Sequence, residues 1–148
     1  MAEQTYLFDE KQKKKDSTLI HWNSGVNLSV NDNKDFLKFG SLTSFSSSEN
    51  SAKIVIPKAG ILKNLTVQLV TSSGDASPGT GQRIFAIRKN GNQTPLAVTI
   101  AGSDTTGSTE DADIEVSVNK YDLISLVHYV GGTPENNAIG IASVELLQ

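Results

Sequence analysis

The chain has 148 residues, of which 37% are hydrophobic and only 6% aromatic, and its net charge at pH 7 is −3. This length predicts a single domain that can enclose a core. The charge argues against nucleic-acid binding, which needs a basic surface, and the lack of cysteine excludes disulfides and thiol catalysis.

The N-terminal residues are mostly polar and charged, with several lysines close behind Asp9 and Glu10. We expect an arm over residues 1–17, either flexible or ordered against a partner, followed by one domain over residues 18–148. Three large apolar side chains favour the partner-ordered alternative, namely Tyr6, Leu7 and Phe8. No secretory h-region and no membrane-length apolar run is present, so we expect a protein made in the cytoplasm that does not enter a membrane.

The clearest local signal is a β-hairpin over residues 83–100, RIFAIRKNGNQTPLAVTI. Asn90-Gly91 favours a two-residue turn because both residues tolerate positive φ. Such a turn would place Phe85 opposite Leu96. Pro95 has no N–H to donate, so we expect either a longer loop or a position at the edge of a sheet.

Further runs of strand-forming residues lie on both sides of this hairpin. Residues 61–71 alternate strictly, residues 123–130 are apolar on both faces, and loops rich in Gly, Ser, Asn and Asp separate the runs. The remaining predicted strands cover residues 18–22, 26–30, 53–57, 112–118 and 138–147. We therefore expect an all-β fold, a β-sandwich of eight to ten strands with jelly-roll (Greek-key) topology.

A search for catalytic residues finds little. His21 and His128 both lie in apolar strand patterns and lack metal-ligand spacing, so we interpret them as packed or interface residues. Carboxylates that suit calcium gather in one region but lack the spacing of a calcium loop, and we expect a solvated edge rather than a cation site. These weak metal candidates are Asp104, Glu110, Asp111 and Asp113.

The segment around Gly79, Gly81 and Arg83 resembles a phosphate loop only superficially, because the Gly-Lys-Ser/Thr ending and a following helix are missing. No Gly-x-Ser-x-Gly elbow occurs. We therefore expect a protein that is not an enzyme and needs no cofactor. A shallow sugar site remains open, since Trp22, Tyr121 and Tyr129 could stack on a ring.

Three segments together resemble small jelly-roll proteins of virus particles: PKAGILKNLTVQL, FAIRKNGNQTPLAVTI and VSVNKYDLISL. The resemblance, which covers residues 53–147, is to the decoration, cement and head-fibre proteins of tailed phages. Similar modules often have Ala-Gly-Asp where this chain has Lys120-Tyr121-Asp122. The resemblance implies a virion location and a non-enzymatic, capsid-associated subunit, with itself (as a homotrimer) and a major capsid or other virion protein as partners.

Two hypotheses follow for how the chain works. As a capsid-associated subunit it would attach through Tyr6, Leu7, Phe8 and Trp22. Its copies would meet at the second apolar face of the central strands, through Ile84, Ala86, Val127 and Tyr129. The N-terminal strands of the same chain are the other candidate cover for that face.

The alternative hypothesis is a β-sandwich module of the tumour-necrosis-factor/C1q or carbohydrate-binding type. It would recognise a receptor or a host glycan through the loops at residues 72–82, 102–111 and 131–137. A cupin-like enzyme is a third possibility that two scattered histidines do not support.

Overall fold

The computed structural model describes residues 16–31, 33–39 and 45–148. In these residues the chain forms two antiparallel sheets and two short 3-10 turns, η1 (Glu49–Ser51) and η2 (Glu110–Ala112). The expected all-β sandwich is confirmed, with eleven strands because several two- and three-residue strands add to the long ones. The strands are β1 (Ser17–Asn23), β2 (Asp35–Leu37), β3 (Phe45–Ser46), β4 (Ile54–Val55), β5 (Gly60–Val70), β6 (Gly79–Lys89), β7 (Asn92–Gly102), β8 (Thr106–Ser108), β9 (Val116–Val118), β10 (Leu123–Gly131) and β11 (Ile139–Leu147).

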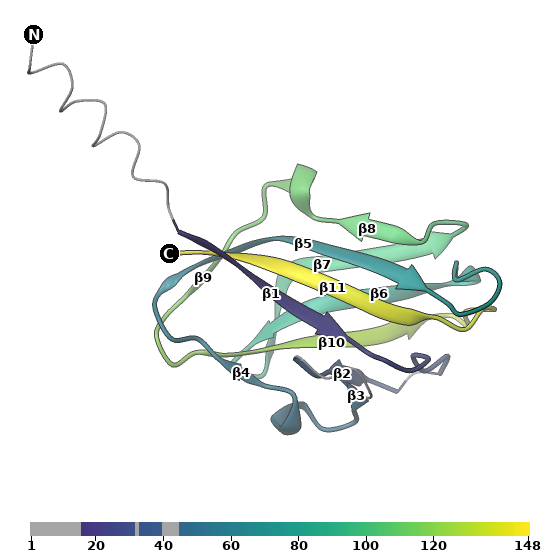
Figure 1. Cartoon of the computed structure of the whole chain (residues 1–148), viewed down its shortest axis with the longest axis horizontal. Helices are drawn as coiled ribbons and strands as arrows, with labels where there is room; N and C mark the ends of the chain where they lie inside the picture. Colours follow the sequence, from purple (N-terminus) through teal and green to yellow (C-terminus); the bar gives the residue numbers. More distant parts are fainter. Residues whose placement is uncertain (1–15, 32, 40–44) are drawn as a thin grey trace, which may run out of the picture.

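The strand order is that of a jelly roll. Sheet A has the order β1-β11-β5-β8, with β9 also paired to β5. Sheet B has the order β3-β2-β10-β6-β7, with β4 also paired to β10. Figure 1 shows the two sheets packed face to face, with the C terminus beside the start of β1. No helix in the described part of the chain is long and apolar enough to cross a bilayer.

The core fills the space between the sheets with alternate side chains of each long strand. Sheet A contributes Trp22, Leu62 and Val144 among others, and sheet B contributes Phe85 and Leu126. A smaller apolar cluster lies on the outer face of sheet B, where Phe36 and Ala52 cover Ala86 and Val127. The N-terminal half of the same chain thus covers part of the second apolar face of the central strands.

The predicted hairpin forms, with a different register. Lys89 pairs with Asn92, and Asn90 and Gly91 have φ of 52° and 84°, so the two-residue turn is confirmed. Phe85 pairs with Val98 rather than Leu96 because β7 bulges: three residues separate Gln93 from Ala97, whereas one separates Arg88 from Ala86. Pro95 lies in the bulge, where no ladder hydrogen bond is needed from its missing N–H. β7 is also the edge strand of sheet B, which is the position expected for a strand that contains Pro95.

Other strand predictions need correction. Residues 26–30 do not form a strand. Within them, Leu28 alone is buried in the core, and its N–H donates a single backbone hydrogen bond to the Ala138 carbonyl. The strict alternation of residues 61–71 is interrupted at Asn64, whose positive φ of 55° marks a bulge that places Leu62 and Leu65 on the same buried face. The predicted strand at residues 112–118 is reduced to β9, since η2 occupies its first residue.

Candidate binding site at the loop end of the sandwich

Three connections meet at the end of the sandwich opposite the C terminus, which we call the loop end (Figure 1). They are the β1–β2 connection (24–34), the β5–β6 connection (71–78) and the β10–β11 connection (132–138). Backbone bonds join them: Leu28 N–H donates to Ala138 O at 2.8 Å, and Glu135 N–H donates to Pro78 O at 2.8 Å. Segments far apart in sequence thus form one continuous surface.

A buried polar network lies directly beneath this surface. It consists of Asp35, His128 and Arg83, three residues that are at most 2% exposed and whose side chains point into the core from β2, β10 and β6. His128 Nδ1 lies 3.1 Å from Asp35 Oδ2, and Arg83 Nη1 lies 3.2 Å from His128 Nε2. The three groups form a chain from a carboxylate through an imidazole to a guanidinium.

The donors in this network determine its protonation. A guanidinium can only donate, so His128 Nε2 must accept and the ring proton must reside on Nδ1, facing Asp35. Burial lowers the pKa of His128, and the charge of Arg83 lowers it further, against the opposing effect of Asp35. Burial alone would raise the pKa of Asp35, but hydrogen bonds from His128 and Ser29 outweigh it and lower that pKa. The network therefore holds one anion, one neutral ring and one cation.

The same network fixes the loops above it. Arg83 Nη1 donates to Ser29 O and Arg83 Nη2 donates to Asn136 O, each at 3.0 Å. Asp35 accepts from Ser29 N–H and from Ser29 Oγ, both at 2.8 Å. Asn136 Nδ2 then donates to Ser77 O at 2.9 Å, which connects the third loop. One buried arginine thus bonds two of the connections directly and is linked to the third through Asn136.

The anchored loops enclose a polar cleft of about 380 Å³, which we call the loop cleft. Its lining is amide, hydroxyl and carboxylate groups, supplied by Asn27, Thr71, Ser72, Ser73, Gly74, Asp75, Glu135, Asn136 and Asn137. Asp75 is already engaged, because Ser77 N–H and Oγ donate to it at 2.9 and 2.7 Å. Within the described residues no hydrogen bond involves the side chains of Asn27, Ser72, Glu135 or Asn137.

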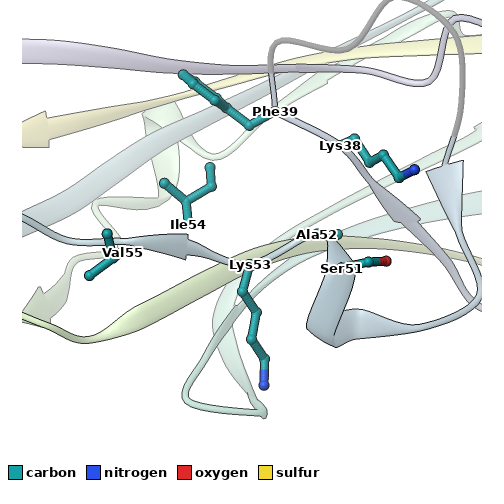
Figure 2. Close-up of a pocket in the computed structure, with 7 residues that line it drawn as sticks. All are labelled: Lys38, Phe39, Ser51, Ala52, Lys53, Ile54 and Val55. Atoms are coloured by element: carbon teal, nitrogen blue, oxygen red, sulfur yellow. The ribbon is translucent and has the colours of Figure 1, made fainter.

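A second hollow is partly apolar and lies on the flank of the sandwich. This groove of about 400 Å³ is lined by residues 38–39 and 51–55, and we call it the lysine groove after Lys38 and Lys53 (Figure 2). Phe39 and Val55 are 56% and 53% exposed there. Phe39 also bridges to Trp22 of β1, which places the groove between the edges of the two sheets.

The structure brings together parts of two predicted loops but few of the predicted single residues. Loop residues 72–75 and 135–137 form the loop cleft, whereas the 102–111 loop, which contains β8, does not line it. Tyr6, Leu7 and Phe8 lie outside the described residues. Trp22 is 1% exposed in the core, so its ring is not presented to a partner or a sugar.

The four predicted interface residues all lie on the outer face of sheet B. Ala86 and Val127 are buried by the chain's own Phe36 and Ala52, while Ile84 and Tyr129 remain partly exposed. The carboxylates Asp104, Glu110, Asp111 and Asp113 are exposed, and among the described residues no group of three metal-ligating side chains occurs.

Sequence reasoning identified His128 as a packed residue but missed Asp35 and Arg83. A usable signal exists for Arg83, which has the same parity as Phe85 and Ile87 in one strand and must therefore point inward with them. Asp35 carries no comparable signal, because its partner His128 is 93 residues away.

Comparisons with known proteins give fold-level matches only. No protein-family model matches the chain, and no curated protein matches it. Among solved structures, it is similar to the globular domain of zebrafish complement 1qA protein, with 10% identity, a TM-score of 0.46, and coverage of 87% of this chain and 95% of that chain.

It is also similar to a family 35 carbohydrate binding module from Clostridium thermocellum, with 9% identity, a TM-score of 0.43, and coverage of 87% and 97%. Murine APRIL at pH 5.0 matches with 10% identity, a TM-score of 0.41, and coverage of 86% and 98%. At these identities and TM-scores the strand order of the chain itself, rather than the matches, defines the fold.

Proposed function

We propose that the chain is a non-enzymatic binding module whose loop cleft recognises a polyhydroxylated ligand, a glycan. The observation that carries this proposal is the convergence of three loops on a polar cleft whose floor is fixed by the buried network. A binding site gains affinity when its groups are already in place before the ligand arrives, since less ordering entropy is lost.

The lining chemistry favours sugar hydroxyls over other ligands. Each hydroxyl both donates and accepts, and it matches side chains such as Asn27, Asn137 and Glu135, which together offer donors and acceptors. No aromatic ring lines the cleft, so stacking does not contribute there. We therefore expect weak binding at one site, with a Kd of about 1 mM, equivalent to about −4 kcal/mol.

Weak single sites become effective when several are joined. We propose that the chain forms a homotrimer, in which three clefts on one particle raise the overall avidity by about 10²–10⁴. We propose that the outer face of sheet A forms this contact, where Leu19, which is 56% exposed, and Ile141 present apolar side chains among polar ones. Sedimentation velocity at micromolar concentration tests the trimer, and a well-folded monomer across that range contradicts it.

The cleft is tested by a glycan-array screen of the protein followed by saturation-transfer NMR with the sugars that bind. Asn137→Ala removes an unengaged amide, and Glu135→Gln replaces an unengaged carboxylate oxygen by an amide NH₂ group that cannot accept. Each should weaken binding about 5- to 30-fold, the loss of one hydrogen bond to a ligand. Ser117→Ala, on the outer face of sheet A at the opposite end, is the matched control and should bind normally. Binding that survives both cleft substitutions refutes the site.

A second candidate function is a structural subunit of a virus particle, attached to a capsid and located in the virion. The resemblance of residues 53–147 to decoration and head-fibre proteins supports it, as do the exposed apolar side chains of the lysine groove, which offer a contact surface for another virion protein. Mass spectrometry of purified particles tests this candidate, and absence of the chain from them contradicts it.

A further inference from the structure

The lining of the loop cleft is polar, and its charge has one sign. Two of the nine residues that line the cleft are acidic, Asp75 and Glu135, and none of the nine is basic. Neither carboxylate forms a salt bridge within the described residues. Lys34, the only basic residue in the three connections, lines a different hollow beside β2 and β3. A ligand in the cleft therefore meets two carboxylates and no cationic side chain.

The buried cation beneath the cleft does not offset this charge. Arg83 is fully buried, and its guanidinium donates to Ser29 O and Asn136 O and contacts His128. Asp35, at the other end of the same chain of side chains, supplies the countercharge. The buried network is thus neutral in sum, and the two carboxylates of the cleft remain uncompensated.

Both carboxylates are held in place before a ligand arrives. Hydrogen bonds from Ser77 N–H and Ser77 Oγ orient Asp75 and hold its pKa below its ordinary value, so Asp75 is ionised at neutral pH. Glu135 N–H donates to Pro78 O, and the Glu135 side chain packs on Gly79, where a Cβ would lie 3.0 Å from Glu135 Cδ. Gly79 has a φ of 71°, which favours glycine, so the backbone there stays bare.

These groups distinguish sugars by charge. A carboxylate accepts hydrogen bonds and cannot donate them, whereas an ammonium group donates three and accepts none, and hydrogen bonds between charged groups are the stronger ones. A sugar with a free amino group therefore complements the cleft. A sugar acid would add a like charge, and like charges in a binding site reject a ligand.

We infer that Asp75 and Glu135 make the loop cleft selective for glycans that carry a free amino group, over neutral glycans and, most strongly, over sugar acids. This inference rests on the proposed glycan site and names the class of sugar that the site takes. Both carboxylates are exposed, so each contributes only the modest attraction of an ion pair in contact with water. We expect about fivefold between amino and neutral sugars, and about fivefold again between neutral sugars and sugar acids.

An NMR titration of the isotope-labelled full-length chain tests this order. The probes are the methyl glycosides of glucose, glucosamine and glucuronic acid, and the same three derivatives of galactose, so that members of a series differ in charge on one ring. Amide signals of residues 72–75 and 135–137 report binding in the cleft. Added salt should shrink the preference for the amino sugar, because it screens exposed charges.

Three variants separate charge from other contacts. Glu135→Gln removes one of the two charges and should lower the preference for amino over neutral sugars from about fivefold to about twofold. Asn137→Ala should weaken amino and neutral sugars alike and keep their ratio. Glu115→Gln removes an exposed carboxylate just before β9, at the opposite end of the sandwich, and is the matched control that should change neither affinity nor ratio.

The outcomes distinguish this inference from the proposed function. Equal affinities for amino and neutral sugars would overturn the inference and leave the glycan site in place. An unchanged ratio in Glu135→Gln would overturn the role of that carboxylate. No shift of the cleft amides with any of the six sugars would refute the glycan site itself, and the inference with it.

A cation without a sugar ring provides the last comparison. Nα-acetyl-lysine methylamide should bind at least about tenfold more weakly than the amino sugars, because it lacks the ring hydroxyls that the amides and hydroxyls of the cleft would bond. Equal binding of this compound would show that the cleft recognises positive charge alone, and would overturn the inference.

Discussion

The two ends of the sandwich are built differently. At the loop end, long connections are held by Asp35, His128 and Arg83, which are buried and far apart in sequence. At the opposite end, which we call the turn end, short turns are held by exposed polar groups close to the surface. Asn90 Nδ2 donates to Asp122 Oδ1 at 2.9 Å, and Asp122 Oδ2 accepts from Asn119 N–H at 2.8 Å.

This difference determines how each end responds to damage. A hydrogen bond exposed to water contributes about 1 kcal/mol, because water replaces a lost partner. A buried charge that loses its partner has no such replacement, so the full cost of removing that charge from water destabilises the folded state. The turn end should therefore weaken in small steps, whereas the loop end should fail when a single member of its network is removed.

The largest expected effect comes from Arg83→Met. The substitution leaves Asp35 buried without a countercharge and removes the donors to Ser29 O and Asn136 O. We expect the free energy of unfolding to fall by about 3–5 kcal/mol, measured by urea denaturation. Arg88→Met is the matched control: it breaks a partly exposed pair with Glu49 and should cost about 1 kcal/mol. Similar losses of unfolding free energy in Arg83→Met and Arg88→Met would contradict the proposed difference between the two ends.

A second substitution separates charge from packing at the same site. Adding Asp35→Asn to Arg83→Met removes the uncompensated anion, so the double variant should be more stable than the single one. A double variant that is less stable by the sum of both losses would show that Asp35 contributes through its hydrogen bonds to Ser29 alone.

The same contrast explains what the sequence could predict. The turn end was predictable because Asn90-Gly91 sets the turn locally, through backbone conformations that only a few residues favour. The sheet fold followed from period-two patterns that lie within each strand. The Pro95 bulge shifted the register by two residues, and alternation alone does not determine where a bulge occurs.

The candidate site was less predictable for a physical reason. Loops 72–82 and 131–137 were suggested as binding loops, but their meeting depends on the bonds from Asn136 Nδ2 to Ser77 O and from Glu135 N–H to Pro78 O. Such contacts join residues more than fifty positions apart, and no local pattern records them. Asn27 lies in residues 26–30, where a strand was expected, and Asp35 lies between two predicted strands, so the sequence assigned neither residue a role.

The next expected effect concerns Gly81, which packs against the β10–β11 loop. A Cβ at this position would lie 2.5 Å from Pro134 N and 2.6 Å from the Thr133 carbonyl carbon, so the loop would have to move. We expect Gly81→Ala to lower stability by about 1–3 kcal/mol and to shift NMR signals of residues 131–137. The exposed neighbour Thr80→Ala is the control, and a similar response from both would exclude this packing explanation.

Acid should act on the loop end before the turn end. Since the pKa of folded His128 lies below its ordinary value of 6.5, the unfolded chain takes up this proton first. Its contribution to stability is therefore complete above about pH 6.5 and is lost as the pH falls below that value, by at most about 1.4 kcal/mol per pH unit.

Urea titrations between pH 7 and 5 measure this slope. His128→Gln removes the titrating group and should flatten it, while His21→Gln, an exposed residue on the outer face of sheet A, should leave it intact. The pKa of Asp122 at the turn end is also lowered, by the Asn119 N–H and by Asn90, but this contribution is lost only as the pH falls below about 3.8. A slope that persists in His128→Gln would assign the acid sensitivity elsewhere.

The smallest expected effect is at the turn end, with Asn90. Its φ of 52° is unfavourable for alanine, and its side chain accepts from Leu123 N–H at 2.8 Å besides bonding Asp122. Asn90→Ala should cost about 1 kcal/mol. Asn90→Gly keeps the backbone conformation and loses only the exposed bonds, so it should cost less than Asn90→Ala. Because Asn90 is exposed, the hairpin should persist in both variants. Loss of folding in either variant would mean that the turn end is as important for stability as the buried network.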